Sequence, residues 1–208
     1  MKIVDHVLLL HYGPTNVFKF SECALIDESL VSDIDRWILY LSRKSIKEFV
    51  LDVWIEGLYK IPPCLFSCQS LLHLKLHCCW LKPPTSIEGF RNLKSLYLNL
   101  VRMAQDAFEN LISGCPLLET LKLIEVEGFS QINIDSPSLK FLKIFGDFEG
   151  ISFVNSFQLA TVVVDLGLYL NSEGNQGRLH GSSSNLLKFF DHRPYIQSLV
   201  IETCFLKV

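Results

Sequence analysis

One short apolar pattern returns along most of the chain at nearly constant intervals. Residues 71–81 read L-x-x-L-x-L-x-x-C-x-L. The first three apolar positions recur in segments that begin at Ile46, Leu93, Leu118, Leu139 and Leu159. A single match could arise in any strand, whereas a run of starts 20 to 25 residues apart indicates an internal repeat. Each repeat can bury its apolar side only against its neighbours, so the chain is expected to stack into a solenoid.

The pattern and its interval are typical of leucine-rich repeats, which run about 20–29 residues each. A second full copy begins at Ile196, and a weaker one begins at Val4. The sequence therefore predicts an α/β fold, a leucine-rich-repeat solenoid with a curved parallel sheet of about eight strands on its concave side. We expect one domain over residues 1–208, with an irregular first repeat at 1–45 and a Gly/Ser-rich surface loop inserted at 171–184.

The segments between the expected strands differ in length and character. Apolar residues at helical spacing predict helices over 29–44 and 104–113, and a shorter one over 184–190. The shortest repeats leave room only for extended or single-turn links. Pro116, Pro137 and Pro194 each stand two residues before the first apolar position of a repeat. Proline disfavours helix at the residue before it, which suits a chain about to enter a strand.

Several segments, in this order along the chain, carry a family resemblance. They are residues 8–14 (LLLHYGP), 32–38 (SDIDRWI), 61–66 (IPPCLF), 89–96 (GFRNLKSL) and 112–119 (ISGCPLLE). The chain resembles the plant F-box/LRR-repeat proteins, many of which also carry an FBD domain. The resemblance implies the substrate-recognition part of an F-box subunit of a cullin-type ubiquitin ligase.

The 208 residues match only the repeat region of that family. No F-box is expected before Met1 or after the last repeat, and no FBD domain is expected at the C-terminus. A ligase adaptor is therefore an expected partner only if a full-length form carries an F-box. The alternative is a stand-alone or truncated repeat protein that binds a partner without recruiting a ligase.

Composition restricts the class of partner. The formal net charge of −3 gives no global attraction to nucleic acid or to an anionic membrane. No apolar run approaches the roughly 20 residues that a membrane-spanning helix needs, and the N-terminus lacks the apolar core of a signal peptide. An odd count of 7 cysteines without an export signal predicts free thiols in a reducing compartment, cytoplasmic or nuclear.

The cysteines and histidines do not suggest chemistry. Cys64, Cys68, His73 and His77 could be taken for zinc ligands, but their spacing matches no common finger. Cys79 and Cys204 occupy the small-residue position of the repeat, and Cys115 and Cys68 stand equally far before a repeat, which favours packing. No nucleophile is paired with a base at mechanistic spacing. We expect binding without catalysis, metal or cofactor.

The outward positions of the strands are the candidate binding residues. Between the last two apolar positions of four neighbouring repeats stand Lys75, Tyr97, Lys122 and Lys143, which would form one basic stripe. The next outward position adds His77, Asn99 and Phe145. This face could be ordinary solvated surface, or it could be a groove for an acidic or phosphorylated partner segment with Tyr97 as an anchor.

The two ends are expected to be poorly protected. A first strand at residues 4–10 and a last one from Ile196 would leave Val7, Leu9, Leu199 and Phe205 beside unpaired backbone groups. Solenoids need polar caps at such ends, and neither a capping helix nor a polar final repeat is predicted here. The chain is therefore expected to self-associate when expressed alone.

Overall fold

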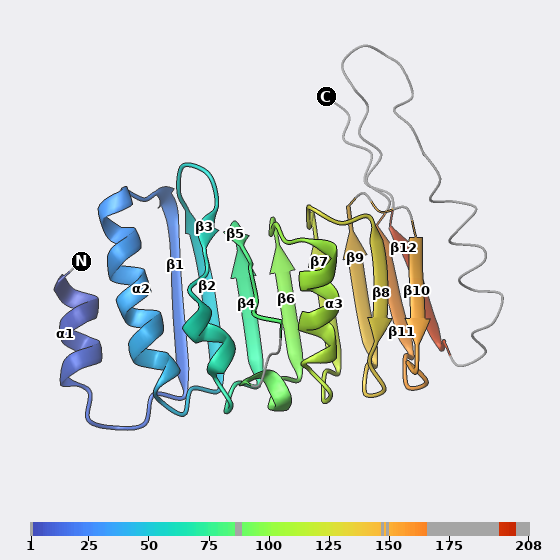
Figure 1. The fold of residues 1–208 in the computed structure, drawn as a ribbon, viewed down its shortest axis with the longest axis horizontal. Helices are drawn as coiled ribbons and strands as arrows, with labels where there is room; N and C mark the ends of the chain where they lie inside the picture. The colour runs from blue at the N-terminus through green and yellow to red at the C-terminus, as the bar shows by residue number, and fades with distance from the viewer. Residues whose placement is uncertain (1, 86–88, 147, 149, 166–195, 203–208) are drawn as a thin grey trace, which may run out of the picture.

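The computed structural model describes residues 2–85, 89–146, 148, 150–165 and 196–202. Within them, one sheet holds eight strands in the order β1-β2-β4-β6-β7-β9-β11-β12, and every neighbouring pair is parallel (Figure 1). The strands are β1 (Val17–Leu25), β2 (Glu48–Trp54), β4 (His73–His77), β6 (Ser95–Asn99), β7 (Thr120–Ile124), β9 (Phe141–Phe145), β11 (Thr161–Asp165) and β12 (Ser198–Glu202). The predicted α/β repeat fold with a parallel sheet is confirmed.

The strands pair so that equivalent repeat positions lie side by side. Leu74 is paired with Leu96, Leu96 with Leu121, and Leu121 with Leu142. Because successive side chains on a strand alternate between the two faces, this register turns one whole apolar column into the core. These four leucines are 0% to 2% exposed. The buried column is the row to which every repeat contributes.

A tight turn introduces the strands, and it explains the prolines. The carbonyl oxygen of Cys115 accepts a hydrogen bond from the N–H of Leu118 at 3.1 Å, and Ser136 and Leu139 repeat the bond at 3.3 Å. Pro116 and Pro137 occupy the second position of these turns, where a φ near −65° is required. Pro194 lies outside the described residues.

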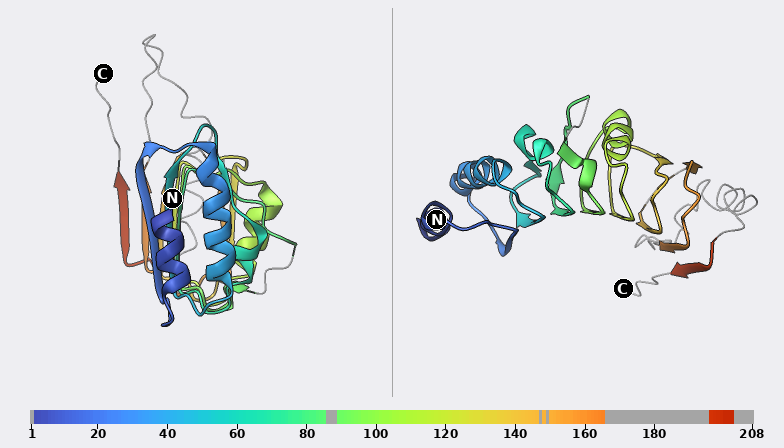
Figure 2. Two further views of the ribbon diagram at one scale, coloured as in Figure 1. Left: turned by 90° about the vertical axis from the view of Figure 1, so that its left-hand side faces the viewer. Right: turned by 90° about the horizontal axis from the view of Figure 1, so that it is seen from below.

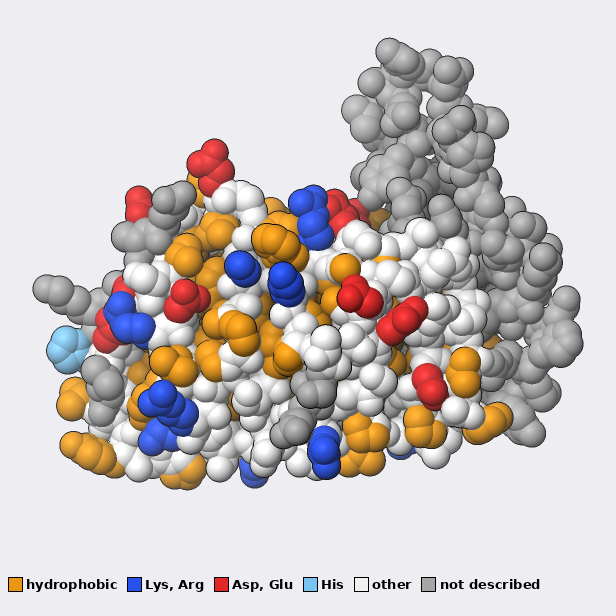
Figure 3. Space-filling model, in the orientation of Figure 1, with side chains coloured by type: hydrophobic (Ala, Val, Ile, Leu, Met, Phe, Trp, Pro, Cys, Tyr) orange, Lys and Arg blue, Asp and Glu red, His pale blue; other side chains and the backbone are white. Residues whose placement is uncertain are grey.

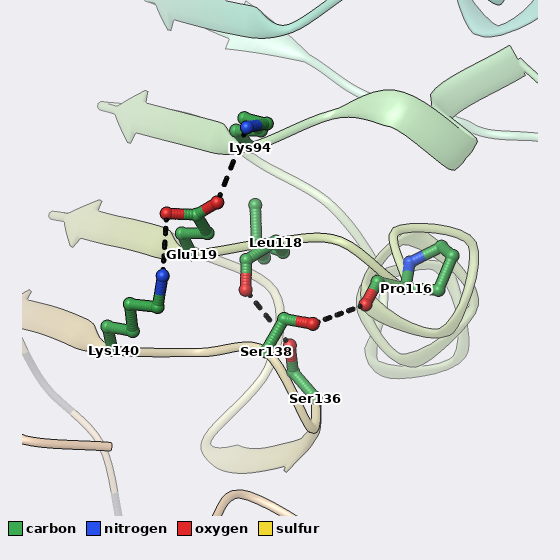
Figure 4. Close-up of polar contacts among 7 residues, drawn as sticks. All are labelled: Lys94, Pro116, Leu118, Glu119, Ser136, Ser138 and Lys140. Atoms are coloured by element: carbon green, nitrogen blue, oxygen red, sulfur yellow. Dashed lines mark hydrogen bonds and ion pairs between the residues drawn. The ribbon is translucent and has the colours of Figure 1, made fainter. Parts of the chain in front are cut away.

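Serine side chains join successive turns (Figure 4). Ser138 Oγ donates to the carbonyl oxygen of Pro116 at 3.0 Å, and the buried Ser136 Oγ donates to that of Leu118 at 3.4 Å. Backbone acceptors of one repeat are thereby satisfied by the next repeat along the chain.

The outer layer covers the convex side of the sheet (Figure 2). Helices α2 (Glu28–Ser42) and α3 (Gln105–Ser113) confirm two predicted helices. The shorter repeats use the single turns η1 (Pro63–Ser67) and η2 (Gly89–Asn92), or the two-stranded ladders β3 (Tyr59–Lys60) with β5 (Cys79–Trp80) and β8 (Gln131–Asp135) with β10 (Gly150–Val154). The helix predicted over 184–190 and the loop predicted over 171–184 lie outside the described residues.

Gly89 allows two of these outer turns to approach closely. A Cβ atom at this position would collide with the carbonyl oxygen of Phe66, in η1. Without a side chain, η2 lies directly against η1, and the rings of Phe66 and Phe90 pack with their centroids 5.7 Å apart. The glycine of the GFRNLKSL segment is thus required by backbone packing.

The N-terminal prediction was wrong. Residues 2–10 form a helix, α1 (Lys2–Leu10), and the edge strand is β1, which no repeat match indicated. Asp5 Oδ1 accepts a hydrogen bond from Trp37 Nε1 at 2.7 Å, which ties α1 to α2. Leu8 is buried, so the apolar run at this end serves helix packing. The expectation that no helix lies at the N-terminal end is therefore corrected (Figure 1).

The last strand pairs as predicted but is not buried as predicted. β12 lies parallel to β11, with Leu199 beside Val162 and Ile201 beside Val164. Leu199 and Ile201 are nevertheless 43% and 58% exposed. The exposed apolar side chain expected at this end is present for Leu199, while Phe205 lies outside the described residues. At the N-terminal end Val7 is 61% exposed, but on α1 and not on an edge strand, and the Leu9 side chain lies outside the described residues.

The buried column predicts that two leucines four residues apart differ sharply in how much they stabilise the fold. Leu121→Ala removes a fully buried side chain and should lower the free energy of unfolding by about 2–5 kcal/mol. Leu117→Ala, at a position that is 45% exposed, should cost less than about 1 kcal/mol. Urea unfolding followed by circular dichroism measures both. Equal losses would contradict the assignment of the apolar column to the core.

Candidate protein-binding surface

The in-register strands build a row of lysines across the open face of the sheet. Lys19 pairs with Val50, Val50 with Lys75, Lys75 with Tyr97, Tyr97 with Lys122, and Lys122 with Lys143. This row, called the lysine row below, holds four lysines and no carboxylate from β1 to β9. The face that carries it is the concave side of the solenoid (Figure 2). The sequence placed Lys75, Tyr97, Lys122 and Lys143 in this row, and the register brings them together.

The next row towards the C-terminal ends of the strands has a different charge. It contains Asp52 on β2, Asp165 on β11 and Glu202 on β12. Between them, His77, Asn99, Ile124 and Phe145 are aligned on β4 to β9. The concave face is therefore basic along the lysine row and acidic towards the outer strands of the second row. On the middle strands β6 and β7, the second row contributes Asn99 and Ile124 beside the lysine row, and neither is a carboxylate.

A shallow hollow of about 380 Å³ lies over the lysine row from Lys19 to Lys122. Its lining includes Lys19, Glu48, His73, Lys75, Tyr97 and Lys122. Tyr97 lies between Lys75 and Lys122 in the row and is half-buried. The hollow is open, as expected of a sheet that presents a surface to a partner.

Two of the lysines rest over aromatic rings. Lys75 Nζ lies 5.1 Å from the ring centroid of Tyr97, and Lys122 Nζ lies 5.5 Å from that of Phe141. A cation over an aromatic face is attracted by the ring quadrupole, and each side chain is thereby held along the sheet. Both lysines are half-buried.

The other two lysines are neutralised by carboxylates. Lys143 Nζ lies 2.9 Å from Glu202 Oε2, and Lys19 Nζ lies 2.5 Å from Glu48 Oε1. The pair formed by Lys143 crosses from β9 to β12, beyond the strand between them. The lysine row thus contains two unneutralised lysines flanked by two paired ones, and of the stripe expected from the sequence only Lys143 is paired with a carboxylate.

His77 lies in the second row as expected, but little of it is accessible. It is 8% exposed, its Nδ1 lies 2.5 Å from Asp52 Oδ1, and the Trp54 ring meets its ring edge to face at 4.8 Å between centroids. Asn99 and Phe145 remain half-buried. Trp54 was not selected from the sequence, although it follows Val50 and Asp52 at alternate positions, which is the signal for the same face.

A second cluster of charge lies where the middle strands begin (Figure 4). Glu119 lies between Lys94, at 3.6 Å, and Lys140, at 3.1 Å. The hydrogen bond from Lys140, followed by the attraction of the two ammonium groups, lowers the pKa of the Glu119 carboxyl. With two lysines around one carboxylate, this cluster carries a net positive charge.

The convex side has a mixed surface. Apolar side chains gather there around β3 and β5, beside scattered charges of both signs (Figure 3). Trp80 is 43% exposed, with Lys60 Nζ 5.5 Å from its ring, and Arg102 forms an ion pair with Glu127 at 2.7 Å. These described contacts of the convex side do not form a row of lysines like the one on the concave face.

The candidate metal ligands do not converge. Among the described residues, no three or more His, Cys, Asp or Glu side chains are grouped so that they could hold a metal ion. Cys68, Cys79 and Cys115 are buried, and the Cys79 thiol donates to the carbonyl oxygen of His77 at 3.0 Å. Burial raises the pKa of the Cys115 thiol to about 12. Cys204 lies outside the described part of the chain.

The repeat, the parallel sheet and the outer single turns together define a leucine-rich-repeat protein. The family model of the leucine-rich repeats of the FBD-associated F-box protein At5g56370 matches residues 34–208. The chain belongs to this plant F-box/FBD/LRR-repeat family, by its repeat region.

Relatives in Arabidopsis thaliana agree with this assignment. The F-box/FBD/LRR-repeat protein At1g13570 is 37% identical over 96% of this chain, and the F-box/LRR-repeat protein At3g26922 is 32% identical over 68% of it. The alignments cover 46% and 44% of those relatives, so the chain spans less than half of their length. No solved structure matches the chain. No helix among the described residues is long and apolar enough to cross a membrane.

The thiols give a test of this packing. Thiolate is the reactive form, so a buried thiol with a raised pKa should resist alkylation. At pH 8, iodoacetamide should modify the half-buried Cys64 well before Cys115, as measured by peptide mass spectrometry. In denaturant, the two residues should react alike. Equal rates in the folded protein would contradict the packing role of Cys115.

Proposed function

We propose that this chain recognises a partner protein through the concave face of its sheet and, in an F-box protein, selects the substrate of a cullin-type ubiquitin ligase. The observation that carries the proposal is the lysine row, because one register aligns side chains from separate repeats on an open surface. Extended concave surfaces are what solenoid repeats use for binding. The F-box in the names of the relatives supports the link to a ligase.

The adaptor of the ligase is expected to bind outside these repeats. In this proposal the F-box supplies the contact with the adaptor, and the leucine-rich repeats supply the contact with the substrate. A repeat protein that binds its partner without a ligase remains the second candidate. The two differ in the fate of the partner, because ligase recruitment would shorten the lifetime of the partner in the cell.

Bulky substitutions on the concave face test the proposal. Ser95→Trp and Thr120→Trp place large side chains on β6 and β7 beside the hollow, where both residues are half-buried. Proximity labelling in plant cells should identify proteins near the natural chain that are lost with the double variant. The exposed Ser113→Trp, on α3, is the matched control and should retain them.

The same variants separate the two candidates. A partner that is lost with the concave double variant should bind the purified natural chain directly. The unfolding midpoints of all variants should be alike, which shows that the loss does not come from unfolding. If it is a ligase substrate, its half-life should lengthen when the natural protein is depleted from plant cells. Partners that the concave double variant retains would refute the concave surface as the recognition site.

A further inference from the structure

The middle of the lysine row has unneutralised charge. Among the described residues, neither Lys75 nor Lys122 has a carboxylate within ion-pair distance, whereas Lys19 and Lys143 each have one. Tyr97 lies between the two, on the strand that separates β4 from β7. This group, Lys75, Tyr97 and Lys122, is called the central patch below. It holds two positive charges that no carboxylate of the described residues neutralises.

The three described strands that carry the central patch contribute no carboxylate to the rows beside it. On β4, β6 and β7, the next row towards the C-terminal ends of the strands contains His77, Asn99 and Ile124. The preceding row contains His73, Ser95 and Thr120 on the same strands. Glu48 is engaged by Lys19, and Glu202 by Lys143. Asp52, on the neighbouring β2, contacts His77. An acidic segment over β4, β6 and β7 would thus meet two lysines and no carboxylate that these strands contribute to the three rows. Complementary charge favours such a segment over a neutral or basic one.

The geometry sets the spacing of the charges. Adjacent strands lie about 4.8 Å apart, so Lys75 and Lys122 are attached to the sheet about 10 Å apart. An extended chain in the polyproline-II conformation rises about 3.1 Å per residue with three residues per turn, so acidic residues three positions apart lie on one side of it and would match two such lysines. The hollow over this part of the sheet can hold the intervening side chains, and Tyr97 offers them a half-buried ring.

The same geometry favours two carboxylates over one phosphate. Phosphate is recognised by converging donors, most often the planar forks of arginine or clustered backbone N–H groups. The described lining of the hollow contains no arginine, and its two unneutralised lysines rest over different rings. Two point charges held apart suit two separate acidic side chains.

We propose that the central patch binds an extended acidic segment of the partner protein, with two carboxylates about three residues apart on Lys75 and Lys122 and an apolar side chain on Tyr97. The inference rests on the proposed function, since it names the chemistry that the concave face selects. Substrates of this chain would then be proteins with an exposed acidic stretch.

Fluorescence anisotropy of labelled peptides measures their affinity for the natural chain directly. The first probe is a set of ten-residue peptides of Gly, Ser and one Leu that carries two Glu one to four positions apart. A second set replaces Glu by Gln, and a third carries one phosphoserine. The two-Glu peptide with the matching spacing should bind about fivefold or more tighter than its Gln counterpart, and added salt should weaken it.

Charge-neutral variants of the chain locate the site. Lys75→Gln and Lys122→Gln should each weaken the two-Glu peptide about three- to tenfold. Lys60→Gln is the matched control, because Lys60 also rests over an aromatic ring but lies on β3, outside the eight-stranded sheet. It loses the same charge and should change the affinity by less than about twofold. Unfolding midpoints verify that all three variants remain folded.

Three results would overturn the inference. They are two-Glu peptides that fail to bind at about 1 mM, lysine-row variants that bind like the natural chain, and a phosphoserine peptide that binds about tenfold tighter than any two-Glu peptide. A further result is a cellular partner that is lost with Ser95→Trp and Thr120→Trp and still binds the Lys75→Gln and Lys122→Gln variants. That result would refute the acidic segment and leave the proposed function in place. A partner indifferent to both sets would refute both.

Discussion

The structure depends on one constraint: equivalent residues of successive repeats must lie directly beside one another. The buried column from Phe49 through Leu74, Leu96 and Leu121 is the physical basis of that register. A slip by one residue on any strand would turn its apolar side chains to the open face and its polar ones into the core. The core therefore fixes the register, and the register in turn fixes which outward side chains become neighbours.

The same constraint explains why a surface could be predicted from a sequence. Once the apolar positions were aligned, the outward residues between them followed, and Lys75, Tyr97 and Lys122 lie side by side as that alignment required. The positions of Pro116 and Pro137 in turns could be predicted equally well, because the fixed φ of proline restricts the backbone positions that it can occupy. Features that repeat, or that depend on one residue's backbone, are carried by local sequence.

What the sequence could not supply depends on contacts between distant segments. Residues 2–10 contain an apolar run that suits a strand or a helix, and the bond from Trp37 to Asp5 belongs only to the helical arrangement. The pairing of Lys143 with Glu202 joins residues 59 positions apart, and Trp54 covers His77 from a neighbouring strand. These contacts decide which outward charges remain available, so the central patch is narrower than the stripe expected from the sequence.

The most direct measurement is the acetylation rate of each lysine, by mass spectrometry, with and without a saturating two-Glu peptide. A lysine covered by a bound carboxylate reacts slowly, whereas a lysine elsewhere is unaffected. The account predicts that the peptide protects Lys75 and Lys122 and leaves Lys60 and Lys94 unchanged. Protection of Lys60 or Lys94 with Lys75 and Lys122 unprotected would place binding elsewhere and contradict the claim that the register of the sheet creates the recognition surface.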